Sequence, residues 1–331
     1  MVQKMSDEKI RERIDLAGIM NGATSCAISG HVHPDGDCIG SCLGLALYLR
    51  KKWPEVKTQV YLDTVREELK FIPGSDTIIT TPAAEGADVF FCLDCADADR
   101  IGKNASLFKT SKTTVCIDHH RTSEPKTTYW YVDPDCSSAS ELVADLLGEE
   151  NIDADIAAAL YTGIITDTGV FRYSSTSPKT MRTAAVLMDK GIDHSRICDQ
   201  AFFTKTYTQQ QILGKALFES VPILDSRAVY AVITQNDMKV MGASSADLDG
   251  ISAQLKLTEG VHCSMLISEQ VTGAFKVSLR SDEMVDVSVI AAHHGGGGHL
   301  RASGCTMTGP LSSIIEKLSG EIALQLDKAG E

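Results

Sequence analysis

Short apolar runs alternate with amphipathic segments along the first 120 residues. The apolar runs are rich in β-branched or aromatic residues and have the length of buried strands; they are 24–32, 58–63, 87–94 and 113–120. Segments with apolar residues at three-to-four spacing, such as 38–53 and 99–109, separate or follow them. This alternation predicts an α/β fold in which helices cover both faces of a parallel sheet.

The pattern changes twice in the remaining sequence. From about 137 to 200 it is helical, and Ser177 followed by Pro178 has the form of a helix start. Beyond about 207, helical and strand-like runs mix again, which predicts a smaller α+β domain. We expect a catalytic domain over 1–185, a linker over 186–207 that contains helix, and a second domain over 208–331.

The composition of the 331 residues, 43% hydrophobic and 23% charged, is that of a globular protein with two domains. Residues 1–20 are predicted to form a charged amphipathic helix rather than a signal peptide, and no run reaches the ~18–20 apolar residues of a membrane span. We therefore expect a cytoplasmic protein. The 10 cysteines are scattered through apolar segments, and we interpret most of them, including the Cys92/Cys95 pair, as reduced core residues.

The net charge of −13 argues against a protein that coats long nucleic acids through a basic surface. It does not exclude small phosphorylated substrates, because divalent cations bound in an acidic pocket make that pocket locally electropositive.

Titratable residues gather where the predicted strands end. His31, Asp35 and Asp37 follow the first strand, Asp94 follows the third, and His119 with His120 follows the fourth. Ligand crevices of open α/β sheets lie beyond the carboxyl ends of the strands, so these distant segments are expected to form one site.

Five of these residues and Asp167 together supply six nitrogen or oxygen donors and no thiolate. They are His31, Asp35, Asp37, Asp94, His119 and Asp167. Such a set suits two hard divalent ions such as Mn²⁺, which can share a hydroxide and stabilise phosphoryl displacement. Taken alone, the stretch "HPDGD" is equally well explained as a solvated turn.

Several motifs together resemble those of the DHH phosphoesterases with a DHH-associated C-terminal domain. These motifs are "HVHPDGDCIGS" (31–41), "LDCAD" (93–97), "IDHHRT" (117–122), "GIITDTGVFRYSST" (163–176), "SLRS" (278–281) and "GGGGHLRASG" (295–304). Within that superfamily the chain is most similar to compact enzymes that cleave very short oligoribonucleotides and linear dinucleotides. Some of these enzymes also remove phosphate from 3′-phosphoadenosine 5′-phosphate (pAp).

The resemblance implies a role for each residue of the first motifs. His31 and Asp35 would hold one Mn²⁺, Asp94 would bridge to the other, and Asp37, His119 and Asp167 would complete the second ion's ligands. His120 would lie beside the scissile phosphate and act in catalysis together with the bridging Asp94. Asp118 is interpreted as a residue that orients a histidine, and His33 as part of the pocket wall.

The glycine run in the second half has two interpretations. Four consecutive glycines are typical of a flexible linker, but here they are framed by a helix-like segment and an apolar continuation. Glycines also let backbone N–H groups approach a phosphate closely. We therefore expect a clamp for the substrate's remote end, formed by Gly296, Gly297, Gly298, His299 and Arg301, to which the family resemblance adds Arg280 and Ser281. His293 and His294 are expected to lie at the end of a helix.

These observations predict a phosphodiesterase that depends on two Mn²⁺ ions, with Mg²⁺ or Co²⁺ as alternative ions, and that converts short RNA or linear dinucleotides to mononucleotides. A cyclic-dinucleotide phosphodiesterase and a manganese pyrophosphatase or exopolyphosphatase are the enzymatic alternatives. A nucleotide-binding sensor is the non-enzymatic one. Long duplex nucleic acid and membranes are not expected as partners, and a homodimer remains an option.

Overall fold

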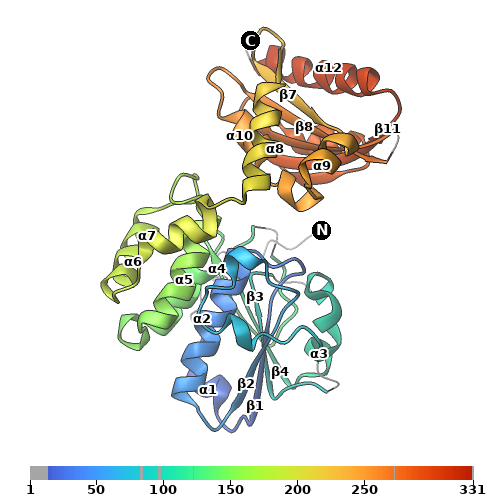
Figure 1. Ribbon diagram of the computed structural model, residues 1–331. Helices are drawn as coiled ribbons and strands as arrows, with labels where there is room; N and C mark the ends of the chain where they lie inside the picture. The colour runs from blue at the N-terminus through green and yellow to red at the C-terminus, as the bar shows by residue number, and fades with distance from the viewer. Residues whose placement is uncertain (1–13, 83–84, 96–97, 122, 272, 330–331) are drawn as a thin grey trace. The chain divides into compact units, whose positions relative to one another are not determined.

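The computed structural model describes residues 14–82, 85–95, 98–121, 123–271 and 273–329. The chain divides into two compact units, residues 1–204 and 205–331 (Figure 1). Of the helix expected over 1–20, residues 1–13 lie outside the described part, and α1 covers Leu16–Met20. Within the described residues, no helix is both long and apolar enough to cross a bilayer.

The N-terminal unit is built on a parallel sheet of five strands in the order β2-β1-β3-β4-β5. Its strands are β1 (Ser25–Ser29), β2 (Lys57–Tyr61), β3 (Val89–Leu93), β4 (Thr113–Asp118) and β5 (Tyr129–Val132). The first four were predicted, and β5 was not. The chain turns to one side of β1 for β2 and to the other side for β3, so the order reverses between β1 and β3. Such a reversal is where α/β sheets place their ligands.

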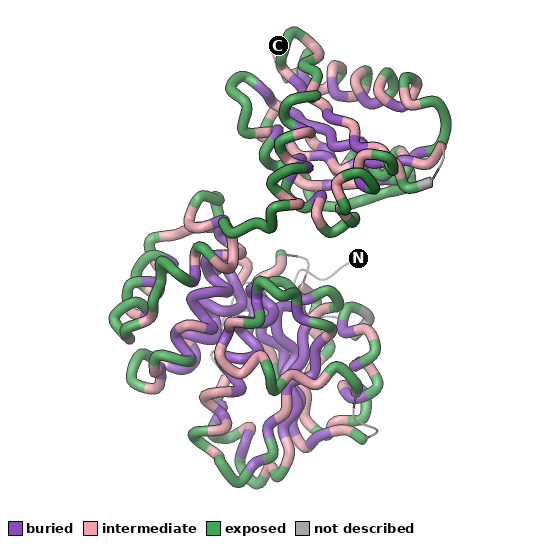
Figure 2. Tube along the Cα trace, viewed as in Figure 1, coloured by how far each residue is buried: buried purple, intermediate pink, exposed green. Residues whose placement is uncertain are grey.

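Helices cover both faces of this sheet, as expected for an α/β fold (Figure 1). They are α2 (Gly36–Lys52), α3 (Ala105–Thr110), α4 (Ala139–Leu147), α5 (Ala154–Asp167), α6 (Pro178–Asp189) and α7 (His194–Cys198). Core residues of α2, α4 and α5 pack on one face, and Leu107 of α3 packs with Phe90 on the other. Every residue of β3 is buried, and Figure 2 shows the sheet as the buried centre of the unit.

The stretch expected as a linker, 186–207, contains the end of α6, then α7, then a π-helical turn over Asp199–Phe203. The C-terminal unit begins with α8 (Tyr207–Phe218). Ser177 accepts a hydrogen bond from the Thr180 amide at the start of α6, and Pro178 occupies the first turn. This confirms the helix start that the sequence predicts there.

The C-terminal unit contains a six-stranded sheet in the order β10-β11-β9-β8-β7-β6. The strands are β6 (Val221–Ile223), β7 (Ala228–Ile233), β8 (Cys263–Val271), β9 (Ala274–Ser281), β10 (Gly297–His299) and β11 (Ala302–Thr308). Only β7 and β8 run parallel. One apolar cluster joins the sheet to α8, α9 (Gln235–Met241) and α10 (Ile251–Lys256), and another to α11 (Val287–His293) and α12 (Leu311–Ala329).

Glycines let α2 approach α5 very closely. A Cβ atom at Gly40 would lie 2.5 Å from the Ala159 carbonyl oxygen, and one at Gly36 would lie 2.4 Å from Thr166 Oγ1. These glycines are four residues apart and share one face of α2. The close packing places Asp37, near the start of α2, beside the end of α5.

Replacing Gly163 by Ala tests this packing. The new Cβ would lie 1.9 Å from Ser140 Oγ and 2.7 Å from Asp37 Oδ1, so we expect a loss of ~1–3 kcal/mol of stability, the usual cost of overpacking. Denaturant unfolding measures the loss, and calorimetric titration should show weaker Mn²⁺ binding. Gly214→Ala in α8 is the matched control, because nothing lies within 4 Å of its Cβ position. An unchanged stability of the Gly163 variant would contradict the packing argument.

Candidate metal centre

The predicted site residues of the N-terminal unit lie beyond the carboxyl ends of three strands. His31 follows β1, Asp94 follows β3, and His119 with His120 follows β4. Asp35 caps the N-terminus of α2 by accepting the amides of Asp37 and Cys38, and Asp167 is the last residue of α5. The sheet and the two helices therefore bring all six predicted donors to one edge of the fold.

His119 lies among three carboxylates. Its Nε2 atom is 3.3 Å from Asp167 Oδ2, 3.4 Å from Asp94 Oδ1 and 3.9 Å from Asp37 Oδ2. Asp37, His119 and Asp167 form one compact group of donor atoms within 4.8 Å of one another. A cation among these atoms could take the imidazole nitrogen and the carboxylate oxygens as its donors.

Asp37 is held rigidly, although it is fully buried. Its two carboxylate oxygens accept the amides of Ala139 (2.7 Å) and Ser140 (2.9 Å), which form the first turn of α4. The positive end of a helix favours a carboxylate at this position. The sequence analysis did not pair the start of this helix with Asp37.

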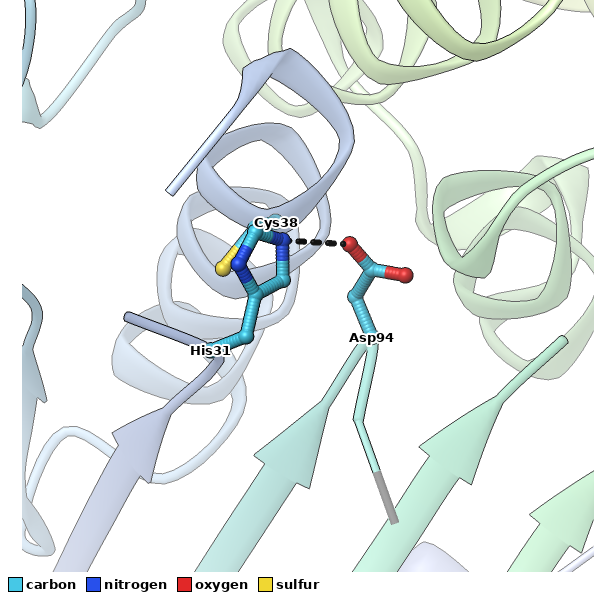
Figure 3. Close-up of side chains that lie close together, drawn as sticks. All are labelled: His31, Cys38 and Asp94. Carbon is cyan, nitrogen blue, oxygen red and sulfur yellow. Dashed lines mark ion pairs between the residues drawn. The ribbon is translucent and has the colours of Figure 1, made fainter. Parts of the chain in front are cut away.

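His31 forms the second group. Its Nδ1 lies 2.8 Å from the Val32 carbonyl oxygen, which accepts a hydrogen bond when Nδ1 carries the proton. That tautomer leaves Nε2 as a lone-pair donor, 3.2 Å from Asp94 Oδ2 (Figure 3) and 3.7 Å from Asp35 Oδ1. A hydrogen bond that fixes the other ring nitrogen is usual for histidines that bind metals.

Asp94 lies between the two histidine groups, since Oδ2 faces His31 and Oδ1 faces His119. It is 3% exposed, and within the described part of the chain Oδ1 has no hydrogen-bond partner. Its φ of 56° is in the left-handed region, which is uncommon for residues other than glycine. A buried carboxylate oxygen without a partner is costly, and a cation would compensate for it. The residues present therefore fit a metal ion.

Asp118 lies behind the histidine pair and is 1% exposed. Its Oδ1 accepts the backbone amides of His119 and His120 and lies 2.7 Å from His120 Nδ1. Burial opposes ionisation of Asp118, but the bond to His120 outweighs it, so the pKa of this carboxyl is lowered. Asp118 thus orients His120.

Without cations, the centre holds more negative charge than it can keep ionised. Burial and the neighbouring Asp94 charge raise the pKa of Asp37 to about 7. Burial and the Asp37 charge raise the pKa of Asp167 to about 8. Burial disfavours protonated histidine, but carboxylates outweigh it and raise the pKa of His31 to about 11 and of His119 to about 10. Protons therefore occupy the donors that cations would replace.

These shifts predict that Mn²⁺ stabilises the protein more at alkaline than at acidic pH. Both carboxyls and both histidines have pKa values above those of an unfolded chain, so the metal-free fold loses stability as pH rises. Mn²⁺ displaces these protons and binds more tightly as they leave. The rise in Tm on adding Mn²⁺ should be larger at about pH 8.5 than at about pH 6. Equal shifts would contradict this picture.

In the C-terminal unit, the strand register aligns two of the predicted substrate residues. His299 pairs with Ala302, and Ala302 pairs with Arg280 across β10, β11 and β9. Residues directly opposite in antiparallel strands share a face of the sheet. His299 is exposed and Arg280 is partly exposed, so both are available on this face.

The structure does not bring the other two polar residues to that face. Arg301 NH1 donates to the carbonyl oxygens of Asp282 and Val285, and Ser281 Oγ donates to the Val285 carbonyl oxygen. Ser281 is buried and follows Arg280 directly in β9, so its side chain points to the opposite face. Both residues therefore fix the turn that follows β9.

The glycine run forms the start of β10 and its approach rather than a free loop. A Cβ at Gly296 would lie 2.1 Å from the Gly304 carbonyl oxygen, whereas Gly297 faces open space and Gly298 has a φ of 143°. At the end of α11, His293 Nδ1 and His294 Nε2 lie 3.1 and 2.7 Å from carboxylate oxygens of Glu321 in α12. These two histidines contact the helix layer, as their position at a helix end suggested.

Comparison with known proteins agrees with this arrangement. The N-terminal domain of the DHH family matches residues 25–164, and the DHHA1 domain matches residues 225–323. The bifunctional oligoribonuclease and PAP phosphatase NrnA of Thermus thermophilus is 30% identical over 311 residues, 92% of this chain and 90% of that protein. The cyclic-di-AMP phosphodiesterase PdeA of Listeria monocytogenes is 28% identical over 302 residues, 82% of this chain but 43% of that protein. The crystal structure of an exopolyphosphatase-related protein from Bacteroides fragilis superposes with a TM-score of 0.86 at 26% identity, covering 95% and 96% of the two chains.

Proposed function

Because this chain belongs to the DHH family and is thus a phosphodiester hydrolase, we propose that it cleaves very short oligoribonucleotides and linear dinucleotides to mononucleotides. Removal of the 3′ phosphate from pAp is part of the proposal, because the Thermus thermophilus relative is named as both an oligoribonuclease and a PAP phosphatase. The enzyme depends on a metal, and we propose two Mn²⁺ ions.

One observation carries the proposal: Asp94 faces His31 with one carboxylate oxygen and His119 with the other. A carboxylate in this position can bridge two cations. His31 and Asp35 would complete the ligands of one ion, and Asp37, His119 and Asp167 those of the other. Two such ions supply a hydroxide nucleophile at neutral pH and neutralise the charge that develops on phosphorus.

His120 has a separate role in this proposal. Its Nδ1–H donates to Asp118, so Nε2 is the ring nitrogen left for the substrate. With its ring held by the Asp118 carboxylate, His120 can present Nε2 to a phosphate oxygen or to the leaving ribose oxygen. Asp118 positions the ring and does not itself contact the substrate.

The C-terminal unit would recognise the nucleotide that is remote from the scissile bond. Arg280 and His299 share one face of the sheet, and a guanidinium beside an imidazole suits a terminal phosphate. Gly297, which faces open space, leaves the backbone there accessible to a phosphate. The acidic net charge of the whole chain disfavours long nucleic acids as substrates.

Incubation of the pure protein and Mn²⁺ with a substrate panel tests the proposed function. The panel contains linear diadenylate and diguanylate, their cyclic forms, pAp, short and long RNA, and inorganic pyrophosphate, with products resolved by chromatography. We expect mononucleotides from the linear dinucleotides and short RNA, and no turnover once a chelator removes the metal. Cleavage of pyrophosphate alone would favour a pyrophosphatase, and binding without turnover would favour a sensor. Preference for cyclic dinucleotides is the second candidate, favoured by the similarity to PdeA.

Arg280→Ala should impair hydrolysis of a dinucleotide more than hydrolysis of a substrate that has no remote nucleotide. Loss of a charge-assisted contact of roughly 3 kcal/mol should lower kcat/KM for a dinucleotide ~10²-fold. Hydrolysis of a minimal aryl phosphodiester should fall far less, because this substrate has no remote nucleotide. Lys276→Ala is the matched control, since Lys276 lies on the same face of β9 and is exposed. Proportional losses on both substrates would contradict the assignment of Arg280 to the remote end.

A further inference from the structure

Cys38 brings a sulfur atom to the half of the metal centre that contains His31. It is the third residue of α2 and is completely buried. Figure 3 shows Cys38 beside the His31 ring, with Asp94 on the other side of that ring. One donor atom from each of His31, Cys38 and Asp94 lies within 4.8 Å of the other two.

The backbone, rather than a flexible side chain, holds the sulfur in this place. Cys38 Sγ lies only 2.2 Å from where a Cβ atom of Gly30 would be, so the absence of a side chain at Gly30 makes room for it. Gly30 directly precedes His31, and the Cys38 amide is bound by Asp35. The thiol is therefore fixed by the same elements that fix two of the proposed metal donors.

The spacing of the three atoms suits a single ion. Donors at ~2.0–2.3 Å from one Zn²⁺ lie up to ~4.5 Å apart, and the three donor atoms here lie within 4.8 Å of one another. Asp94 supplies the second observation, because it is 3% exposed and directs its Oδ2 to within 3.2 Å of His31 Nε2 in this same group. The sequence-based donor set consisted of nitrogen and oxygen atoms alone and omitted this sulfur.

We propose that Cys38 is an additional metal donor, which thiophilic divalent cations such as Zn²⁺ and Cd²⁺ recruit through its thiolate. On binding, the S–H bond breaks, a metal–sulfur bond forms, and the proton leaves to water. Hard Mn²⁺ is held through nitrogen and oxygen, because it gains little from sulfur. Cys38 thereby makes the His31 half of the centre more selective for soft ions than its imidazole and carboxylates would be. This inference rests on the metal centre of the proposed function.

Titration of the metal-free protein with Co²⁺ and with Cd²⁺ tests the proposal directly. Thiolate ligation produces a charge-transfer absorption in the ultraviolet that oxygen and nitrogen ligands do not. The wild type should show this band at saturation, and Cys38→Ala should lack it. Cys42→Ala is the matched control and should retain it, because Cys42 is also buried in α2, one turn further on.

Affinity provides a second readout. Cys38→Ala should bind Cd²⁺ ~10–100-fold more weakly, the range typical for loss of a group at a metal site, and Mn²⁺ affinity should change by a smaller factor. A wild type without the band, or a band that Cys42→Ala removes, would overturn the proposal. Dinucleotide hydrolysis with Mn²⁺, measured on the same wild-type preparation, tests the proposed function separately. Hydrolysis without a thiolate band refutes only the role of Cys38, and a band without hydrolysis refutes only the proposed function.

Discussion

Asp94→Asn should lower turnover of a linear dinucleotide by at least ~10³-fold. A bridging Asp94 would let both cations act on one phosphate. Each ~1.4 kcal/mol of charge stabilisation that is lost in the transition state slows turnover tenfold. Asparagine removes the charge but keeps the shape, and it tolerates the left-handed backbone conformation that residue 94 adopts at a φ of 56°. Activity and bound Mn²⁺ should therefore fall together while the fold survives.

The metal-free Asp94→Asn protein should fold, and its stability should fall less steeply than that of the wild type as pH rises. The Asp94 charge raises the pKa values of Asp37, Asp167, His31 and His119, so its removal weakens the uptake of protons by the metal-free centre. Asp88→Asn is the control, because Asp88 precedes β3 and accepts hydrogen bonds from Thr24 away from the site. That variant should keep normal Mn²⁺ stoichiometry. Wild-type turnover in Asp94→Asn would refute the bridging role.

The variants His119→Ala and His120→Ala should lose activity for different reasons. His119→Ala removes the nitrogen on which Asp37, Asp94 and Asp167 converge, so the protein should lose one of its two ions. His120→Ala should retain both ions and lose ~10²–10⁴-fold in kcat, the usual contribution of a positioned acid or base. Metal analysis measures the loss of a bound ion, and single-turnover kinetics measures the loss of the catalytic step.

Equal metal loss in both variants would show that His120 is a ligand and that its bond to Asp118 has another purpose. Asp118→Asn tests whether Asp118 positions His120 for catalysis rather than only supporting the fold. Loss of the carboxylate should release the His120 ring from this hydrogen bond and lower kcat with little change in KM, while bound Mn²⁺ stays constant.

Hydrophobic patterning was sufficient to predict the sheet of the N-terminal unit and the edge on which its chemistry lies. Titratable residues follow the apolar runs of β1, β3 and β4, and in a parallel sheet such strand ends meet on one side. By contrast, β5 is four residues long, and β6 and β10 have three residues each, too few for periodicity to register. The strand β10 is also two-thirds glycine, a composition that sequence reasoning associates with loops.

Packing decides the features of the site that sequence spacing cannot. The amides of Ala139 and Ser140 in α4 bind Asp37, and Gly163 of α5 leaves room for this contact, because a Cβ there would lie 2.7 Å from Asp37 Oδ1. No local sequence pattern reports such a contact. Likewise, the apolar surroundings of Cys38 indicated a core residue, which it is, but not that its sulfur borders His31. Arg301 follows His299 by two residues, yet a turn directs its guanidinium to carbonyl oxygens instead.

The order in which the donor residues are synthesised determines when this protein can acquire its metal. His31 is made first, and Asp167, at the end of α5, is made last. A growing chain on the ribosome would therefore offer two imidazoles and four carboxylates in one place only after α5 had emerged and docked against α2. Ions that require all six donors would bind the completed N-terminal unit, so they would stabilise the finished fold by mass action rather than nucleate it. Maturation of the enzyme should consequently follow folding and depend on the cellular supply of free Mn²⁺ at that moment.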